Sequence, residues 1–149
     1  MQEFSETQYF RRNKISIFFS IFSAIILGLL VKSFFDEGNH NKASIIGISI
    51  MGSILLLFNL MKLECKITDQ KIEYKYFPLH RKWRSIDRTE VANISFLKYS
   101  ALGDYGGWGV RYGSKRWAYN VSGNYGIFVE FKSGKTVMLG TVKYKELCK

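Results

Sequence analysis

Two long apolar runs near the start of this sequence constrain its fold more than any other feature. They span Ile15–Phe35 and Ala43–Met61, with only the short polar segment 36–42 between them. Each run is close to the roughly 20 residues that a helix needs to cross about 30 Å of hydrocarbon. Neither run has the polar outer face of a helix that covers a soluble core. We therefore expect a transmembrane hairpin over residues 15–62, with helices at about 15–35 and 43–62.

Basic residues on both outer flanks of the hairpin predict its orientation. They are more numerous before and after the hairpin than beside its turn, which also carries Asp36 and Glu37. Because cationic flanks prefer the cytoplasm, we expect a multi-pass protein of the inner (cytoplasmic) membrane with both termini cytoplasmic. A signal peptide is the alternative for the first run, but no Ala-x-Ala site precedes Asp36 and a second apolar run follows at once. Residues 1–14 are then expected to be a polar cytoplasmic arm with nothing to fold around. The basic residues are Arg11, Arg12 and Lys14 before the hairpin, Lys32 and Lys42 beside the turn, and Lys62, Lys66, Lys71 and Lys75 after it.

Small residues recur along both apolar runs. Ser20, Ala24 and Gly28 stand four residues apart in the first run, and Ser49 and Ser53 repeat that spacing in the second. Small faces let helices approach closely in lipid. These faces either seal the hairpin or also form a homo-oligomer. Neither run carries a charge near its middle, so no residue is a candidate for ion or proton transport.

The remaining residues, 63–149, have the size of one small cytoplasmic domain. Basic residues outnumber acidic ones two to one here, and the whole chain has a formal net charge of +10. Such a domain suits anionic lipid headgroups. Nucleic acid suits the charge equally but is not expected for a domain held at a membrane, and ordinary solvated charge is the plain alternative. Cys65 and Cys148 have no metal or redox spacing, so we expect no metal and no cofactor.

Short alternating runs in this region predict a β domain. Apolar residues recur at every second position in Leu63–Thr68 and Lys71–Phe77, as in half-buried strands. We expect an α+β protein in which about seven antiparallel strands form a small barrel or sandwich. A short C-terminal helix over Val142–Lys149, capped by Thr141, would pack on it. The other expected strands are Arg81–Ile86, Val91–Tyr99, Arg116–Val121, Gly126–Lys132 and Thr136–Gly140.

Three segments of the domain resemble a known family. These segments are Trp108–Arg111, Ala118–Ile127 and Leu139–Thr141, with Gly134-Lys135 and Glu146-Leu147 nearby. They are similar to bacterial membrane proteins in which two transmembrane helices precede a pleckstrin-homology-like domain. The resemblance implies a seven-stranded, two-sheet barrel closed by a C-terminal helix. It implies no established biochemical activity.

The segment Ser100–Lys115 is the main candidate for recognition, because glycine and large aromatic residues alternate in it. Its glycines do not form a phosphate loop, since the residues that follow read as a strand rather than a helix. Tyr105 and Trp108 supply rigid contact area, and Arg111 supplies donors for a carboxylate or phosphate. We hypothesise that Trp108 and Arg111 mark a binding region. The alternative is that Trp108 plugs the barrel and Arg111 pairs with a buried acid or backbone carbonyl.

A second candidate is a basic cluster around Trp83. Arg81, Lys82 and Arg84 could meet lipid phosphates with Trp83 at the interface, or could line a solvated strand edge. No grouping of His, Ser, Cys or carboxylate residues suggests catalysis. We expect a non-enzymatic binding or scaffold module at the cytoplasmic face of the membrane, with a protein partner or anionic lipid headgroups as ligand. The alternative is a membrane-bound enzyme, or a subunit of a membrane complex, whose site the sequence does not reveal.

Overall fold

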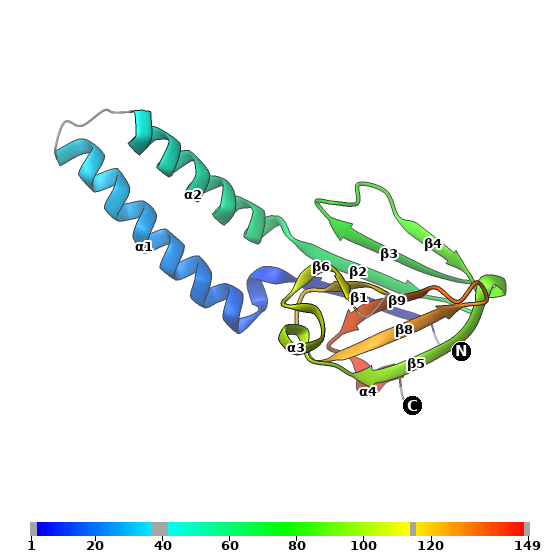
Figure 1. The fold of residues 1–149 in the computed structure, drawn as a ribbon. Helices are drawn as coiled ribbons and strands as arrows, with labels where there is room; N and C mark the ends of the chain where they lie inside the picture. The colour runs from blue at the N-terminus through cyan, green and yellow to red at the C-terminus, as the bar shows by residue number, and fades with distance from the viewer. Residues whose placement is uncertain (1–2, 37–41, 114–115, 148–149) are drawn as a thin grey trace. The chain divides into compact units, whose positions relative to one another are not determined.

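The computed structural model describes residues 3–36, 42–113 and 116–147. The chain divides into two units, one helical and one built mainly of β-strands (Figure 1). The helical unit is Phe10–Leu60, and the β unit combines Met1–Tyr9 with Met61–Lys149. The expected α+β class is therefore confirmed. The expected domain boundary is not, because the first residues of the chain belong to the β unit.

The helical unit contains α1 (Lys14–Asp36) and α2 (Lys42–Leu60), preceded by the short 3-10 helix η1 (Phe10–Arg12). In the part of the chain that is described, α1 alone is long and apolar enough to qualify as a membrane span, from Lys14 to Phe35. The described apolar stretch of α2, Ile45–Leu60, is shorter. A membrane association through α1 fits this finding, whereas a second crossing through α2 stays a prediction.

The buried face of α1 differs from the predicted small-residue face. Ser16 and Ser23 are buried, whereas Ala24 and Gly28 are exposed. The Oγ atoms of Ser49 and Ser53 on α2 donate hydrogen bonds to carbonyls one turn earlier, at 2.8 and 2.7 Å. Such bonds satisfy hydroxyls inside an apolar helix. The predicted face on α1 therefore does not seal the hairpin, and its role in a homo-oligomer stays a prediction.

The first β-sheet contains a strand that the sequence analysis treated as an unfolded arm. β1 (Phe4–Tyr9) pairs antiparallel with β2 (Lys62–Ile67) over six residues, from Phe4 opposite Ile67 to Tyr9 opposite Lys62. The sheet continues through β3 and β4, in the order β1-β2-β3-β4. β3 spans Lys71–Phe77 and β4 spans Arg84–Asp87, three residues later than the expected start at Arg81.

The inward face of β1 is polar at two of three positions. The strand therefore lacks the alternation of apolar and polar residues by which the other strands were predicted. Phe4, Glu6 and Gln8 are buried, but Glu6 and Gln8 read as surface residues in a sequence. Glu6 accepts hydrogen bonds from the Thr141 hydroxyl at 2.6 Å and from the Val142 backbone N–H at 3.0 Å. The Gln8 amide donates to the Gly140 carbonyl at 2.7 Å. β1 is thus bonded to both sheets.

The second sheet has five strands in the order β5-β8-β9-β7-β6. β7 and β9 pair in parallel, and the other neighbours are antiparallel. The expectation of about seven strands, all antiparallel, was therefore wrong, because the described residues form nine strands and one parallel pair. β1 was not expected, whereas β6 falls where the residues after the glycines read as a strand but were not counted among the seven. The strands are β5 (Val91–Lys98), β6 (Gly109–Gly113), β7 (Arg116–Asn120), β8 (Tyr125–Phe131) and β9 (Thr136–Thr141).

Three short helices complete the β unit. They are η2 (Arg88–Glu90), α3 (Ala101–Tyr105) and α4 (Tyr144–Leu147). The expected C-terminal helix is present in its described part, and the Thr141 hydroxyl accepts a hydrogen bond from the Lys143 N–H at 3.1 Å, close to the expected cap. Tyr144 of α4 stacks on Tyr125 with ring centroids 3.7 Å apart.

The second sheet is covered on both faces. Its inner face packs on the first sheet, as the Tyr119 ring shows by lying 5.0 Å from the Tyr74 ring. Because strand residues alternate, Phe128 and Met138 point to the outer face. There they form a second buried cluster with Tyr99, Ala101 and Ala118, against which Tyr105 and Trp108 pack. The helix α3 and the chain that follows it therefore act as a cover for this outer face.

A candidate binding pocket beside Trp108

The glycine-rich segment begins with a tightly capped helix. The Ser100 hydroxyl accepts a hydrogen bond from the Gly103 N–H at 3.0 Å, and the Ser100 N–H donates to an Asp104 carboxylate oxygen at 2.8 Å. Such reciprocal bonds satisfy donors at a helix start. Gly106 ends α3 in the left-handed region at φ 68°, which a side chain would disfavour. The glycines thus shape a bend rather than a phosphate loop.

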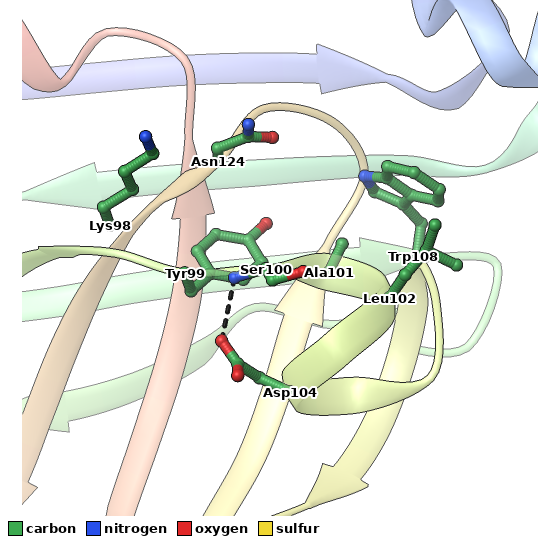
Figure 2. A pocket seen from close by; sticks show the side chains of 8 residues that line it. All are labelled: Lys98, Tyr99, Ser100, Ala101, Leu102, Asp104, Trp108 and Asn124. Atoms are coloured by element: carbon green, nitrogen blue, oxygen red, sulfur yellow. Dashed lines mark hydrogen bonds between the residues drawn. The ribbon is translucent and has the colours of Figure 1, made fainter.

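Trp108 lies on the outer cluster and also faces a pocket. Its ring is half-buried against the cluster, and its indole Nε1–H is buried with no acceptor in the described part of the chain. In Figure 2 this nitrogen lies on the side of the ring toward Asn124. Trp108 therefore covers the outer cluster and lines a pocket, and its role in binding stays a prediction.

The pocket encloses about 510 Å³ and is open to solvent (Figure 2). Residues from the end of β5, from α3 and from the turn before β8 meet in it. Leu102, which is 64% exposed, contributes apolar surface beside Trp108. The lining residues are Lys98, Tyr99, Ser100, Ala101, Leu102, Asp104, Trp108 and Asn124.

The polar groups of this pocket combine hydrogen-bond donors with one carboxylate. Asp104 is held by the Ser100 N–H. Burial raises the pKa of the Tyr99 hydroxyl to about 12, so this phenol stays neutral near pH 7. Lys98 supplies positive charge at the rim, and the Trp108 Nε1–H supplies a donor without a partner. The site is suited to a ligand with an apolar group next to a hydrogen-bond acceptor.

The structure places the other predicted residues of this region outside the pocket lining. Arg111 is exposed on β6, with its guanidinium near the Gly107 backbone. Tyr105 packs edge-on against Tyr99 at 5.9 Å between ring centroids, and burial raises the pKa of its hydroxyl. Sequence reasoning missed Lys98 and Asn124, because only the pairing of β5 with β8 brings them together.

The predicted basic cluster occupies the loop between β3 and β4 and the first residue of β4. Arg81, Lys82 and Arg84 are exposed. Trp83 is 39% exposed, and the Lys66 ammonium lies 5.0 Å from the centroid of its ring. Leu79, which the sequence analysis did not single out, is 66% exposed in the same loop. A lone leucine has no periodic signal, so only the structure could identify it.

His80 anchors this loop. Its backbone N–H donates to the Tyr76 carbonyl at 2.6 Å, and its Nδ1 accepts from the Tyr76 N–H at 3.4 Å. Its ring lies 5.3 Å from the Tyr119 ring and 5.9 Å from the Tyr74 ring. Burial, and then the nearby Arg84 guanidinium, lower the pKa of His80, so the imidazole is neutral near pH 7. His80 thus joins the two sheets.

The described residues do not meet the requirements of a metal site or of a reactive thiol. Within the described ranges no group of three or more His, Cys, Asp and Glu side chains comes together as a metal site requires. Burial, with a smaller effect of Glu6, raises the pKa of the Cys65 thiol to about 12, so the thiol is protonated and unreactive.

Comparisons with known proteins identify no relative of this chain. Neither protein families, nor curated proteins, nor solved structures give a significant match to this chain. The resemblance to pleckstrin-homology-like membrane proteins therefore stays a prediction from the sequence.

Proposed function

We propose that this protein is a membrane-tethered binding module, in which the α1–α2 hairpin holds a β domain beside the bilayer and the pocket at Trp108 takes a segment of a partner protein. The observation that carries the proposal is the pocket itself, with a buried indole donor that has no described partner. Its volume of about 510 Å³ lies within the range of natural ligand sites. A module of this kind needs no catalytic groups.

The chemistry of the pocket indicates the kind of segment. An apolar side chain of the partner can rest between Leu102 and the Trp108 ring. A carbonyl or carboxylate beside it can accept from the Trp108 Nε1–H, and the charge of Lys98 favours an acidic group. A protein segment offers both features in adjacent residues. Anionic headgroups would use Lys98 but would leave the apolar surface unused.

The pairing of β1 with β2 supports two membrane crossings, one through α1 and one back through α2. Tyr9 ends β1 and pairs with Lys62, which begins β2. A chain that crosses the bilayer on α1 must cross back before Lys62 in order to form this pair. With 19 residues, α2 is close to the roughly 20 that a crossing requires. The basic outer flanks favour the cytoplasmic side of the inner membrane for both termini. We also propose a pleckstrin-homology-like fold, which two packed sheets with a terminal helix support and from which the nine strands and the parallel β7–β9 pair depart.

The pocket is tested by blocking its entrance with a charge. Leu102→Arg places a guanidinium beside Trp108 at an exposed position, and Leu97→Arg is the control, since Leu97 is 50% exposed on β5 and does not line the pocket. Crosslinked partners are recovered from native membranes that carry each full-length variant. We expect Leu102→Arg to lose the partner that wild type and Leu97→Arg retain, with unchanged melting temperature. Equal recovery from both variants would refute the pocket as the binding site.

A further inference from the structure

The strand register places the loop between β3 and β4 at the end of the first sheet where β1 ends and β2 begins. Tyr9 pairs with Lys62, and Lys62 pairs in turn with Phe77, so the end of β1, the start of β2 and the end of β3 lie side by side. After Tyr9 the chain leaves the sheet through η1 and α1, and after α2, which ends at Leu60, it returns to the sheet at Lys62. The loop that follows Phe77 therefore begins at the end of the first sheet from which the chain continues into α1 and to which it returns from α2.

The exposed side chains of this loop have the character of a membrane-surface contact. Leu79 and Trp83 are 66% and 39% exposed, although both would be expected to seek burial in a soluble protein. Tryptophan is enriched at the level of the headgroups, where its ring is partly apolar and its N–H stays hydrated. Arg81 and Lys82 lie between these two residues, Arg84 follows Trp83, and all three are exposed. Apolar anchors among basic residues are typical of segments that bind anionic bilayer surfaces.

The base of the loop is rigid while its tip is not buried. His80 is held by two hydrogen bonds to the Tyr76 backbone and by its ring contact with Tyr119. This anchor keeps the neighbouring Leu79 and Arg81 directed away from the core. On the first sheet, Lys66 adds a further positive charge next to the Trp83 ring. A preformed loop can bind a surface without a large loss of conformational entropy.

We propose that the Leu79–Arg84 loop contacts the headgroup layer of the bilayer that holds the hairpin, with Leu79 and Trp83 inserted at the interface and Arg81, Lys82 and Arg84 on anionic lipid headgroups. This inference rests on the proposed membrane tether, but not on the partner pocket. It gives the β domain an attachment to the bilayer in addition to its covalent links.

Lipid quenching of tryptophan fluorescence tests this contact in the full-length protein. The protein is placed in nanodiscs of equal parts phosphatidylcholine and phosphatidylglycerol, with or without brominated acyl chains. We expect brominated lipid to quench a component of the fluorescence that Trp83→Phe removes. The control is Trp117→Phe, because Trp117 is 49% exposed on β7, and this variant should keep the quenched component. If Trp83→Phe leaves the quenching unchanged, the loop does not contact the bilayer.

The contribution of the positive charges is tested in the same discs by neutralising two of them. Arg81→Gln with Lys82→Gln should reduce quenching of Trp83 to the level seen in phosphatidylcholine alone. The matched control is Lys132→Gln with Lys135→Gln, two exposed lysines at the turn between β8 and β9, which should change nothing. Equal quenching in all variants would overturn the role of anionic headgroups. Failure of the chain to enter discs at all would overturn the membrane tether together with this inference, whereas entry with unquenched Trp83 overturns the inference alone.

Discussion

The two sheets of the β unit bury their residues in different patterns. In the first sheet, β2 and β3 alternate between buried and less buried positions. In the second sheet, β8 has four buried residues in a row, and β9 ends with four. The difference follows from what covers each sheet, because the second sheet packs on the first and is also covered by α3 and Trp108. A continuous run of buried residues therefore indicates that both faces of the strand are covered, and not that the strand is of a different kind.

The two sheets also contribute different chemistry to their contact. The second sheet presents Ile127, Val129 and Leu139, all completely buried. The first sheet presents apolar residues from β2 and β3, but its edge strand β1 presents Glu6 and Gln8. Apolar packing supplies most of the energy at the centre. At the edge, directional hydrogen bonds set the position of β1 against the second sheet.

The largest loss of stability is expected at the apolar centre. Leu139→Ala should lower the free energy of unfolding by about 2–5 kcal/mol, because it removes buried methyl groups and leaves a cavity. Leu97→Ala is the matched control at a half-exposed position, where a change within about 0.5 kcal/mol is expected. Thermal unfolding of the full-length variants in detergent, followed by near-ultraviolet circular dichroism, measures both. Equal losses would show that the centre does not dominate the contact between the sheets.

A smaller loss is expected at the polar edge. Glu6→Ala leaves the Thr141 hydroxyl and the Val142 N–H without their acceptor, and should cost about 1–3 kcal/mol. Thr7→Ala changes an exposed residue of the same strand and should be nearly neutral. The same melting experiment compares the two. A neutral Glu6→Ala would mean that β1 is held by its pairing with β2 alone.

The smallest effect is a pH dependence at the seam between the sheets. His80 is packed against Tyr74 and Tyr119 and lies near Arg84, and its pKa is lowered in the folded protein. The unfolded chain therefore takes up a proton more readily, and stability should fall as the pH drops below about 6.5. His80→Asn retains an acceptor but does not titrate, so this part of the pH dependence should disappear. Melting curves between neutral and mildly acidic pH measure the difference, and an unchanged slope in the variant would assign it to other groups.

The sequence predicted those elements whose buried side is apolar. β2, β3, β5, β8 and β9 were expected within one or two residues of their observed ends, because period-two alternation or a continuous apolar run marks them. β1 was missed because Glu6 and Gln8 gain their burial from partners more than 130 residues away in the sequence. The length of α1 was predicted well, since an apolar run needs no tertiary partner.

The candidate site was predictable only in part. Trp108 was identified because a large aromatic among glycines is unusual, and it does line a pocket. The remainder of the pocket depends on the register of β5 with β8, which places Lys98 opposite Tyr125 and so beside Asn124. Register depends on side chains of both strands and on the turn between distant elements, so a local pattern does not contain it.

The pairing of β1 sets the order of events during synthesis. β1 is made before β2, and the whole of α1 and α2 is made between them. The hydroxyl that satisfies Glu6 lies 135 residues further along the chain. At a translation rate of about 5–20 residues per second, the strand waits on the order of ten seconds for this partner. The contact between Glu6 and Thr141 can therefore form only after β9 has left the ribosome, when the hairpin has already been made. A completed β unit thus requires that the chain has come back after α2, so that β2 pairs with β1.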